Sequence, residues 1–61
     1  MSDETEVIYV QVKAETEKAI LVDYEGDDYW LPKSQLEDWP NVEEFGEIAC
    51  PIWLLEEKGM I

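Results

Sequence analysis

The sequence predicts a mainly β fold of the β-rich α+β kind: a small antiparallel meander with one short helical turn and a short C-terminal helix. Three observations lead to this prediction. Two stretches rich in β-branched residues alternate apolar and polar positions, connectors of hairpin length follow each of them, and Pro and Gly flank a short apolar segment near the C-terminus. Such a sheet could curl into an SH3-like or OB-like half-barrel, although the pattern leaves barrel closure open.

The first expected strand covers residues 6–13, after a flexible acidic tail over residues 1–5. Because side chains alternate along a strand, Ile8, Val10 and Val12 share one face, which we expect to be buried. The other face is mixed in character.

A polar connector over residues 14–18 leads to a second expected strand over residues 19–24, with Ile20 and Val22 on one face. Residues 25–28 are expected to form a turn, because Gly26 can adopt a positive φ at little cost.

Residues 29–31 form a short third strand, which Pro32 ends or places at the sheet edge. A single helical turn is expected over residues 32–39. Within it, Ser34 and Glu37 have the spacing of a capping box, in which each side chain satisfies a free backbone amide.

Leu36 and Trp39 lie three residues apart and should both point inward from this turn. Trp30 ends the third strand beside the turn, so we expect its truncation to alanine to unfold the domain.

A fourth strand is expected over residues 47–50, and a helix over residues 51–58 with Gly59 just past its end. So short a helix needs tertiary packing, for which Ile52, Leu55 and Trp53 are the candidate contacts.

A chain of 61 residues forms one domain, here residues 6–61, with a marginal core. Cys50 is the only cysteine and lies in an apolar stretch, so it is expected in the core, and no intrachain disulfide can form. Without histidine, a structural metal is not expected either. Good packing or self-association must supply the stability.

The charge excludes several functional classes. Sixteen Asp and Glu against four Lys, with no His, give a net charge of −12. Such a surface repels nucleic acid phosphates and anionic membranes and attracts basic protein surfaces. The start of the chain is acidic and no apolar run approaches about 20 residues, so we expect neither a secretory signal nor a membrane span, and a cytoplasmic location.

Four aromatic residues could form a stacking platform for bases on a small curved sheet. Such a platform also needs a row of Lys or Arg that contacts the phosphates, and the four scattered lysines do not form one. We therefore expect these side chains to pack in the core and on the sheet faces, without direct nucleic acid binding. They are Tyr9, Tyr24, Tyr29 and Trp30.

No catalytic constellation emerges, and no enzyme and no cofactor are expected. Ser34 has no histidine to activate it, and Lys33 is expected to be a solvated lysine. The acidic cluster around Gly26 fails the spacing of a calcium-binding EF-hand loop, so no metal site is expected.

Residues 19–36 and 51–59 together resemble a family of short bacterial and phage proteins of unassigned role. That family has a Trp-Leu-Pro-Lys-Ser-Gln stretch after a hairpin and a closing Pro-x-Trp-Leu-x-x-Glu-Lys-Gly stretch, and both occur here, with Leu36 where Ile is commoner. The resemblance implies a phage or mobile-element setting in a bacterial host. It implies no reaction and no functional residues.

We therefore expect a non-catalytic acidic module that binds another protein. Its carboxylates would imitate a phosphate backbone and block a basic nucleic-acid-binding surface of a host protein, in the manner of phage inhibitors such as anti-CRISPR proteins. Lysines at positions 27 and 28 should abolish this binding. The candidate partner-binding residues are Glu15, Glu17, Asp23, Glu25, Asp27, Asp28, Glu37, Asp38, Glu43 and Glu44.

The alternative is a small adaptor that binds its partner through an apolar patch containing Trp39 and Trp53, or that self-associates through edge strands into a homodimer. Salt separates the two hypotheses, because charge mimicry weakens steeply as salt rises and an apolar interface does not.

Overall fold

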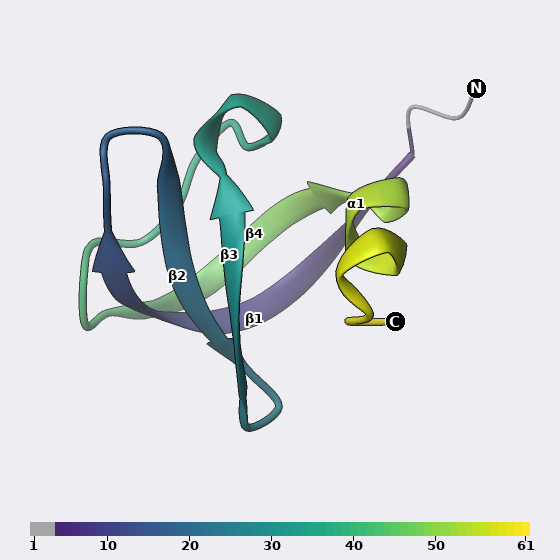
Figure 1. Cartoon of the computed structure of the whole chain (residues 1–61). Helices are drawn as coiled ribbons and strands as arrows, with labels where there is room; N and C mark the ends of the chain where they lie inside the picture. The colour runs from purple at the N-terminus through teal and green to yellow at the C-terminus, as the bar shows by residue number, and fades with distance from the viewer. Residues whose placement is uncertain (1–3) are drawn as a thin grey trace.

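The computed structural model describes residues 4–61 and confirms the mainly β fold (Figure 1). Four antiparallel strands form one sheet in the order β3-β2-β1-β4. Within residues 4–61, β3 and β4 are the edges and do not pair with each other, so the sheet stays open. The elements are β1 (Thr5–Glu15), β2 (Ala19–Tyr24), β3 (Asp27–Pro32), the 3-10 helix η1 (Lys33–Gln35), β4 (Phe45–Pro51) and α1 (Ile52–Lys58). The tail predicted over residues 1–5 lies mostly outside the described residues.

Strand β1 organises the sheet because it has two partners in succession. Its first part, from Thr5 to Gln11, pairs with β4, and its second part, from Gln11 to Glu15, pairs with β2. The register with β2 shifts at Lys13, between Val12 and Ala14. Such a bulge bends a strand and increases its twist, and Figure 1 shows β1 as a strongly curved strand.

The turn between β2 and β3 is shorter than predicted. It consists of Glu25 and Gly26 alone, both with positive φ, at 52° and 88°. Two such residues match the twist of the flanking strands, so pairing resumes at once between Tyr24 and Asp27. The prediction of a turn over residues 25–28 was therefore wrong for Asp27 and Asp28, which belong to β3.

The hydrophobic core lies on one face of the curved sheet, which we call the inner face. The two predicted buried faces, with Ile8, Val10 and Val12 on β1 and Ile20 and Val22 on β2, are confirmed. Helix α1, the segment after η1 and the C-terminal end complete the core. Its members are Ile8, Val10, Val12, Ile20, Val22, Leu31, Leu36, Ile48, Cys50, Leu54, Leu55 and Met60.

On β3 the alternation places Tyr29 and Leu31 toward the core and Trp30 on the opposite face. Leu31 is fully buried, opposite Ile20, and Tyr29 packs against the core. Trp30 is 45% exposed, which argues against the expectation that its truncation to alanine unfolds the domain.

The helical turn predicted over residues 32–39 is reduced to η1, and its capping box is absent. Pro32 occupies the N-cap position, and no side chain caps it. The backbone is extended again at Leu36, so Glu37 lies beyond the helix and cannot complete the motif. The inward placement of Leu36 and Trp39 is confirmed, with Leu36 buried and Trp39 packed against the core.

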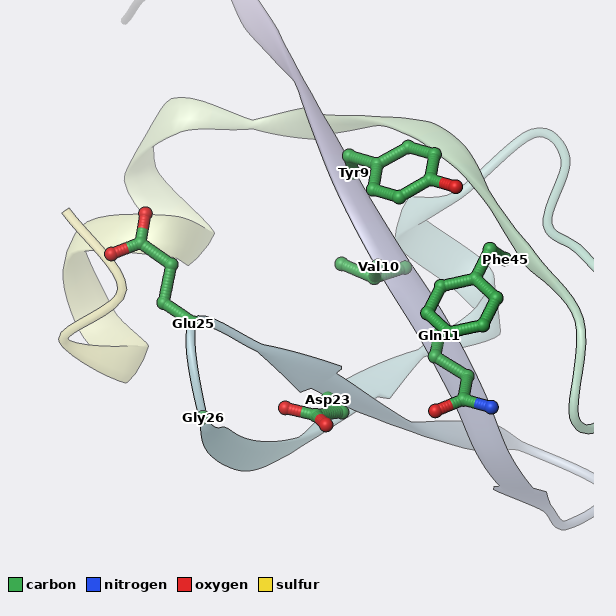
Figure 2. Close-up of a pocket in the computed structure, with 7 residues that line it drawn as sticks. All are labelled: Tyr9, Val10, Gln11, Asp23, Glu25, Gly26 and Phe45. Carbon is green, nitrogen blue, oxygen red and sulfur yellow. The ribbon is translucent and has the colours of Figure 1, made fainter.

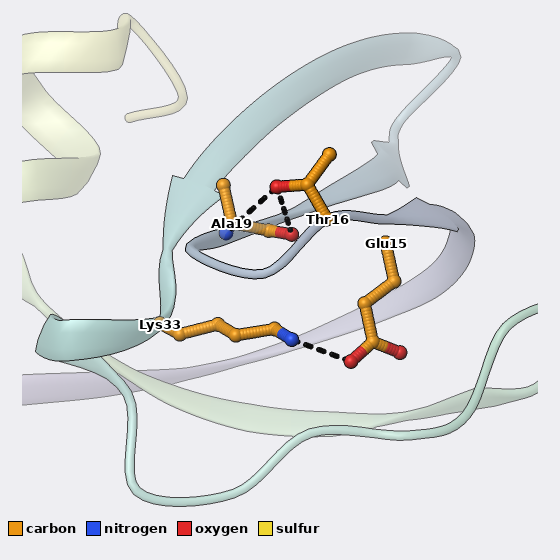
Figure 3. Close-up of polar contacts among 4 residues, drawn as sticks. All are labelled: Glu15, Thr16, Ala19 and Lys33. Carbon is orange, nitrogen blue, oxygen red and sulfur yellow. Dashed lines mark hydrogen bonds and ion pairs between the residues drawn. The ribbon is translucent and has the colours of Figure 1, made fainter.

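Lys33 connects three segments, which corrects the prediction of a solvated lysine. Its ammonium group forms an ion pair with Glu15 at the end of β1 (Figure 3) and lies 5.4 Å from the ring centroid of Trp39. Its backbone N–H donates to the carbonyl of Lys18, at 2.8 Å. In the same hairpin the Thr16 hydroxyl bonds both backbone groups of Ala19.

Helix α1 ends as predicted, with Gly59 in the left-handed conformation at a φ of 77°. Pro51 is the N-cap and not the first helical residue. Leu55 is buried as expected, but the second docking residue is Leu54, whereas Trp53 remains 44% exposed.

Cys50 is a buried free thiol on β4, as predicted, and burial raises its pKa. In the described part of the chain, no helix has both the length and the apolar character that crossing a bilayer requires.

The contact between Gly46 and Pro40 gives a prediction about packing. A Cβ at position 46 would lie 2.6 Å from Cγ of Pro40, a distance so short that the surrounding backbone or Pro40 would have to shift. We expect Gly46→Ala to lower the free energy of unfolding by about 1–3 kcal/mol in urea denaturation.

The control compares Gly46 with Gly46→Ala in a chain that also carries Pro40→Ala. Without Cγ, the nearest atom of residue 40 is its Cβ, at the ordinary contact distance of 3.5 Å. Gly46→Ala should then cost much less than in the parent, and an equal cost in both backgrounds would contradict the clash.

Two adjacent residues of β3 test the assignment of its faces. Leu31→Ala should cost about 2–5 kcal/mol, because it opens a cavity in the core. Trp30→Ala should cost roughly 1 kcal/mol, because half of this side chain faces water. Thermal melts followed by circular dichroism measure both, and a larger loss for Trp30→Ala would contradict the assigned faces.

Candidate partner-binding face

We call the second face of the sheet the outer face. Within residues 4–61, no helix or loop packs a second hydrophobic core against it. Strand pairing places opposite residues on the same face, so its members follow from the register. They are Thr5, Val7, Tyr9, Gln11 and Ala14 of β1, Ala19, Leu21 and Asp23 of β2, Asp28, Trp30 and Pro32 of β3, and Phe45, Glu47, Ala49 and Pro51 of β4.

An exposed aromatic pair stands at the junction of β1 and β4. The rings of Tyr9 and Phe45 are stacked, with centroids 6.0 Å apart and planes inclined by 13°. Tyr9 is 63% exposed and Phe45 61% exposed, and Val7 beside them is also exposed. Large apolar side chains gathered on one exposed face are typical of a surface that contacts a partner.

A shallow pocket of about 230 Å³ lies next to this pair (Figure 2). Tyr9 and Phe45 form its aromatic side, and Gln11 lies between them and Asp23 of the neighbouring strand. The β2–β3 turn contributes the remaining wall. The lining residues are Tyr9, Val10, Gln11, Asp23, Glu25, Gly26 and Phe45.

Two carboxylates face each other across the outer face. Asp23 and Asp28 are direct cross-strand partners, an arrangement that destabilises a sheet when both carry the same charge. Lys13 reaches over from the bulge in β1 and pairs with Asp28, with 3.4 Å between Nζ and Oδ1. Within residues 4–61, no ion pair or side-chain hydrogen bond engages the Asp23 carboxylate.

Glu25 lies at the edge of the pocket and acts on its neighbour Tyr24. The Tyr24 hydroxyl donates a hydrogen bond to the Glu25 carboxylate, and this bond, more than burial, raises the pKa of the phenol. Glu25 also has a φ of 52°, in a turn position that favours Asn or Gly over Glu.

The ten carboxylates predicted to bind a partner do not form one surface. Asp23 and Glu25 both line the pocket, with the Glu25 carboxylate directed away from Asp23 (Figure 2), and Asp28 lies beside it. Asp27, adjacent to Asp28 along β3, is on the inner side. Glu15 and Glu17 lie at the β1–β2 hairpin, where Glu15 is held by Lys33.

The remaining four are in the connection from η1 to β4. Asp38 accepts the backbone N–H of Trp39, and Glu44 accepts that of Asn41. Glu43 has a φ of 74°, and its N–H donates to the carbonyl of Val12. Glu37 is exposed in the same connection.

Phe45 and Gln11 line this pocket but were not predicted as partner-binding residues. The alternation in residues 6–13 already separated Tyr9 and Gln11 from the buried face, which was the available signal. Phe45 was assigned to a loop, because the expected fourth strand began at residue 47 and not at Phe45.

The four aromatic residues considered for a stacking platform are split between the two faces, in line with the expected packing in the core and on the sheet faces. Tyr24 and Tyr29 pack against the core, whereas Tyr9 and Trp30 are exposed on the outer face. Of the two tryptophans expected to bind a partner, Trp53 is exposed and Trp39 is half-buried under Lys33.

Among residues 4–61, no three Cys, Asp or Glu side chains come together in a group that could hold a metal ion. No protein-family model, curated protein or solved structure matches this chain. The resemblance to short phage proteins stays a prediction.

Proposed function

We propose that this chain is a non-catalytic module that docks its outer face on a basic surface of a partner protein. The observation that carries the proposal is the coincidence, on one uncovered face, of the stacked Tyr9–Phe45 pair with the unpaired Asp23 carboxylate. Interfaces commonly combine such aromatic anchors with a polar rim.

The charge of the chain favours a cationic partner over a second copy of itself. Two chains that each carry −12 repel one another, and a symmetric contact through the outer face would add further opposed carboxylates. A basic surface would instead relieve the repulsion between Asp23 and Asp28.

A basic surface that handles nucleic acid is the partner this chemistry fits best. Such surfaces present Lys and Arg to phosphates, and the carboxylates of Asp23, Asp28 and Glu47 offer negative charge along the strands of the outer face. Blocking that surface would make the chain an inhibitor, a role that suits the phage or mobile-element setting that the resemblance implies.

An adaptor that binds mainly through apolar contacts is the second candidate, and the exposure of Val7, Tyr9 and Phe45 favours it. Both candidates use the outer face. They differ in salt dependence, because only an interaction dominated by charge weakens strongly between low and physiological salt.

The proposal is tested with fluorescein-labelled nona-lysine as the probe, by fluorescence anisotropy at low salt. Asp23→Lys with Asp28→Lys changes the charge of the outer face, and Glu56→Lys with Glu57→Lys makes the same change on α1 as the matched control. We expect the first pair to weaken binding at least about tenfold and the second no more than about threefold.

Circular dichroism first establishes that both double variants are folded. Equal weakening by the two pairs would mean that net charge alone attracts the peptide, and it would contradict a role for the outer face. If binding survives in 1 M salt, charge is not its main source, and the result would favour the second candidate, which binds through apolar contacts.

A further inference from the structure

We infer that the pocket between the Tyr9–Phe45 pair and the β2–β3 turn receives a single arginine side chain of the partner. This inference rests on the proposed function and names the group that the outer face recognises. It follows from three features of the pocket: its aromatic side, its unpaired carboxylate and its size.

The aromatic side suits a planar cation. Tyr9 and Phe45 are stacked almost parallel, so together they present a continuous π surface, more than half of which is open to water. A guanidinium group stacks on such a surface through its flat face, with a cation–π attraction of about 0.5–1 kcal/mol at an exposed site.

The polar side offers acceptors where the guanidinium edge would point. Asp23 lies directly opposite Gln11 across the β1–β2 pairing, so the carboxylate and the amide are neighbours in the pocket. The Gln11 Nε2 donates to the carbonyl of Glu43, at 3.3 Å, which leaves Oε1 as an acceptor. Figure 2 shows this oxygen on the side of the amide where Asp23 lies.

The surrounding charges are arranged for one incoming cation. Lys13 pairs with Asp28 at the surface and so offsets only part of the repulsion between the two aspartates, and Asp23 is the member of the pair that lacks a cation. Glu25 lines the pocket at the β2–β3 turn but directs its carboxylate away from Asp23 (Figure 2), so Asp23 supplies the negative charge inside the pocket. An arginine bound to Asp23 would remove the like-charge repulsion across β2 and β3.

Size and geometry favour arginine over lysine and over a larger ligand. About 230 Å³ is below the roughly 300–1,000 Å³ of sites for small-molecule ligands, so one side chain is the fitting occupant. A guanidinium can bond a carboxylate with two parallel N–H donors while it stacks on the rings, whereas a lysine ammonium is a strongly hydrated point charge.

The experiment is a two-dimensional ¹⁵N NMR titration of the intact chain with N-acetyl-arginine amide. N-acetyl-citrulline amide has the same shape without the charge, and N-acetyl-lysine amide has the charge without the planar group. We expect millimolar binding of the arginine derivative, with shifts at the Gln11 side-chain amide and the Gly26 backbone amide. The citrulline derivative should cause none, and the lysine derivative should bind at least about threefold more weakly.

Two matched variants assign the contact to the pocket. Asp23→Asn should weaken arginine binding at least about fivefold, whereas Asp27→Asn, the same change on the inner side of the same hairpin, should leave it unchanged. Phe45→Ala should also weaken binding, without unfolding, because this side chain is exposed.

Equal binding of the arginine and lysine derivatives, or equal effects of Asp23→Asn and Asp27→Asn, would overturn the arginine pocket. If nona-lysine still required the outer face, the proposed function would stand without the pocket. Failure of both probes to reach the outer face would overturn the two proposals together.

Discussion

The fold rests on one constraint, which is that the described residues cover only one face of the four-stranded sheet. The bulge at Lys13 bends β1, so that β4 and the β2–β3 hairpin contribute to the same inner core. Helix α1 and Leu36 complete that core. No chain remains among the described residues to cover the other side, and the outer face is therefore exposed.

This constraint explains why aromatic residues and carboxylates occupy the same surface. Alternation along β1 and β4 leaves Tyr9 and Phe45 largely in water, so folding gains little hydrophobic stabilisation from either ring. Alternation along β2 and β3 brings Asp23 opposite Asp28, where like charges repel. A partner with apolar and cationic groups would bury the two rings and relieve the Asp23–Asp28 repulsion, which is the basis of the proposed function.

Sequence patterns predicted the elements whose environment is local and missed those set by tertiary contacts. The buried faces of β1 and β2 followed from period-two alternation of β-branched residues. The face of Trp30 could not be predicted because three residues of expected strand do not fix it, whereas the pairing of Leu31 with Ile20 decides it. Phe45 was missed because it joins β4 only through pairing with Gln11, 34 positions earlier. The two halves of the aromatic pocket thus became visible only in three dimensions.

The central claim is that the outer face, and not the acidic surface in general, contacts the partner. Site-specific cross-linking in cells that produce the chain tests it most directly, with benzoylphenylalanine at position 45 on the outer face or at position 53 on α1. Both positions are occupied by exposed aromatic residues, so the replacement is comparable. We predict that position 45 cross-links to a protein with a basic surface, that Asp23→Lys abolishes the product, and that position 53 yields none. Products from position 53 alone, or a cross-linked dimer of the chain itself from position 45, would contradict the account.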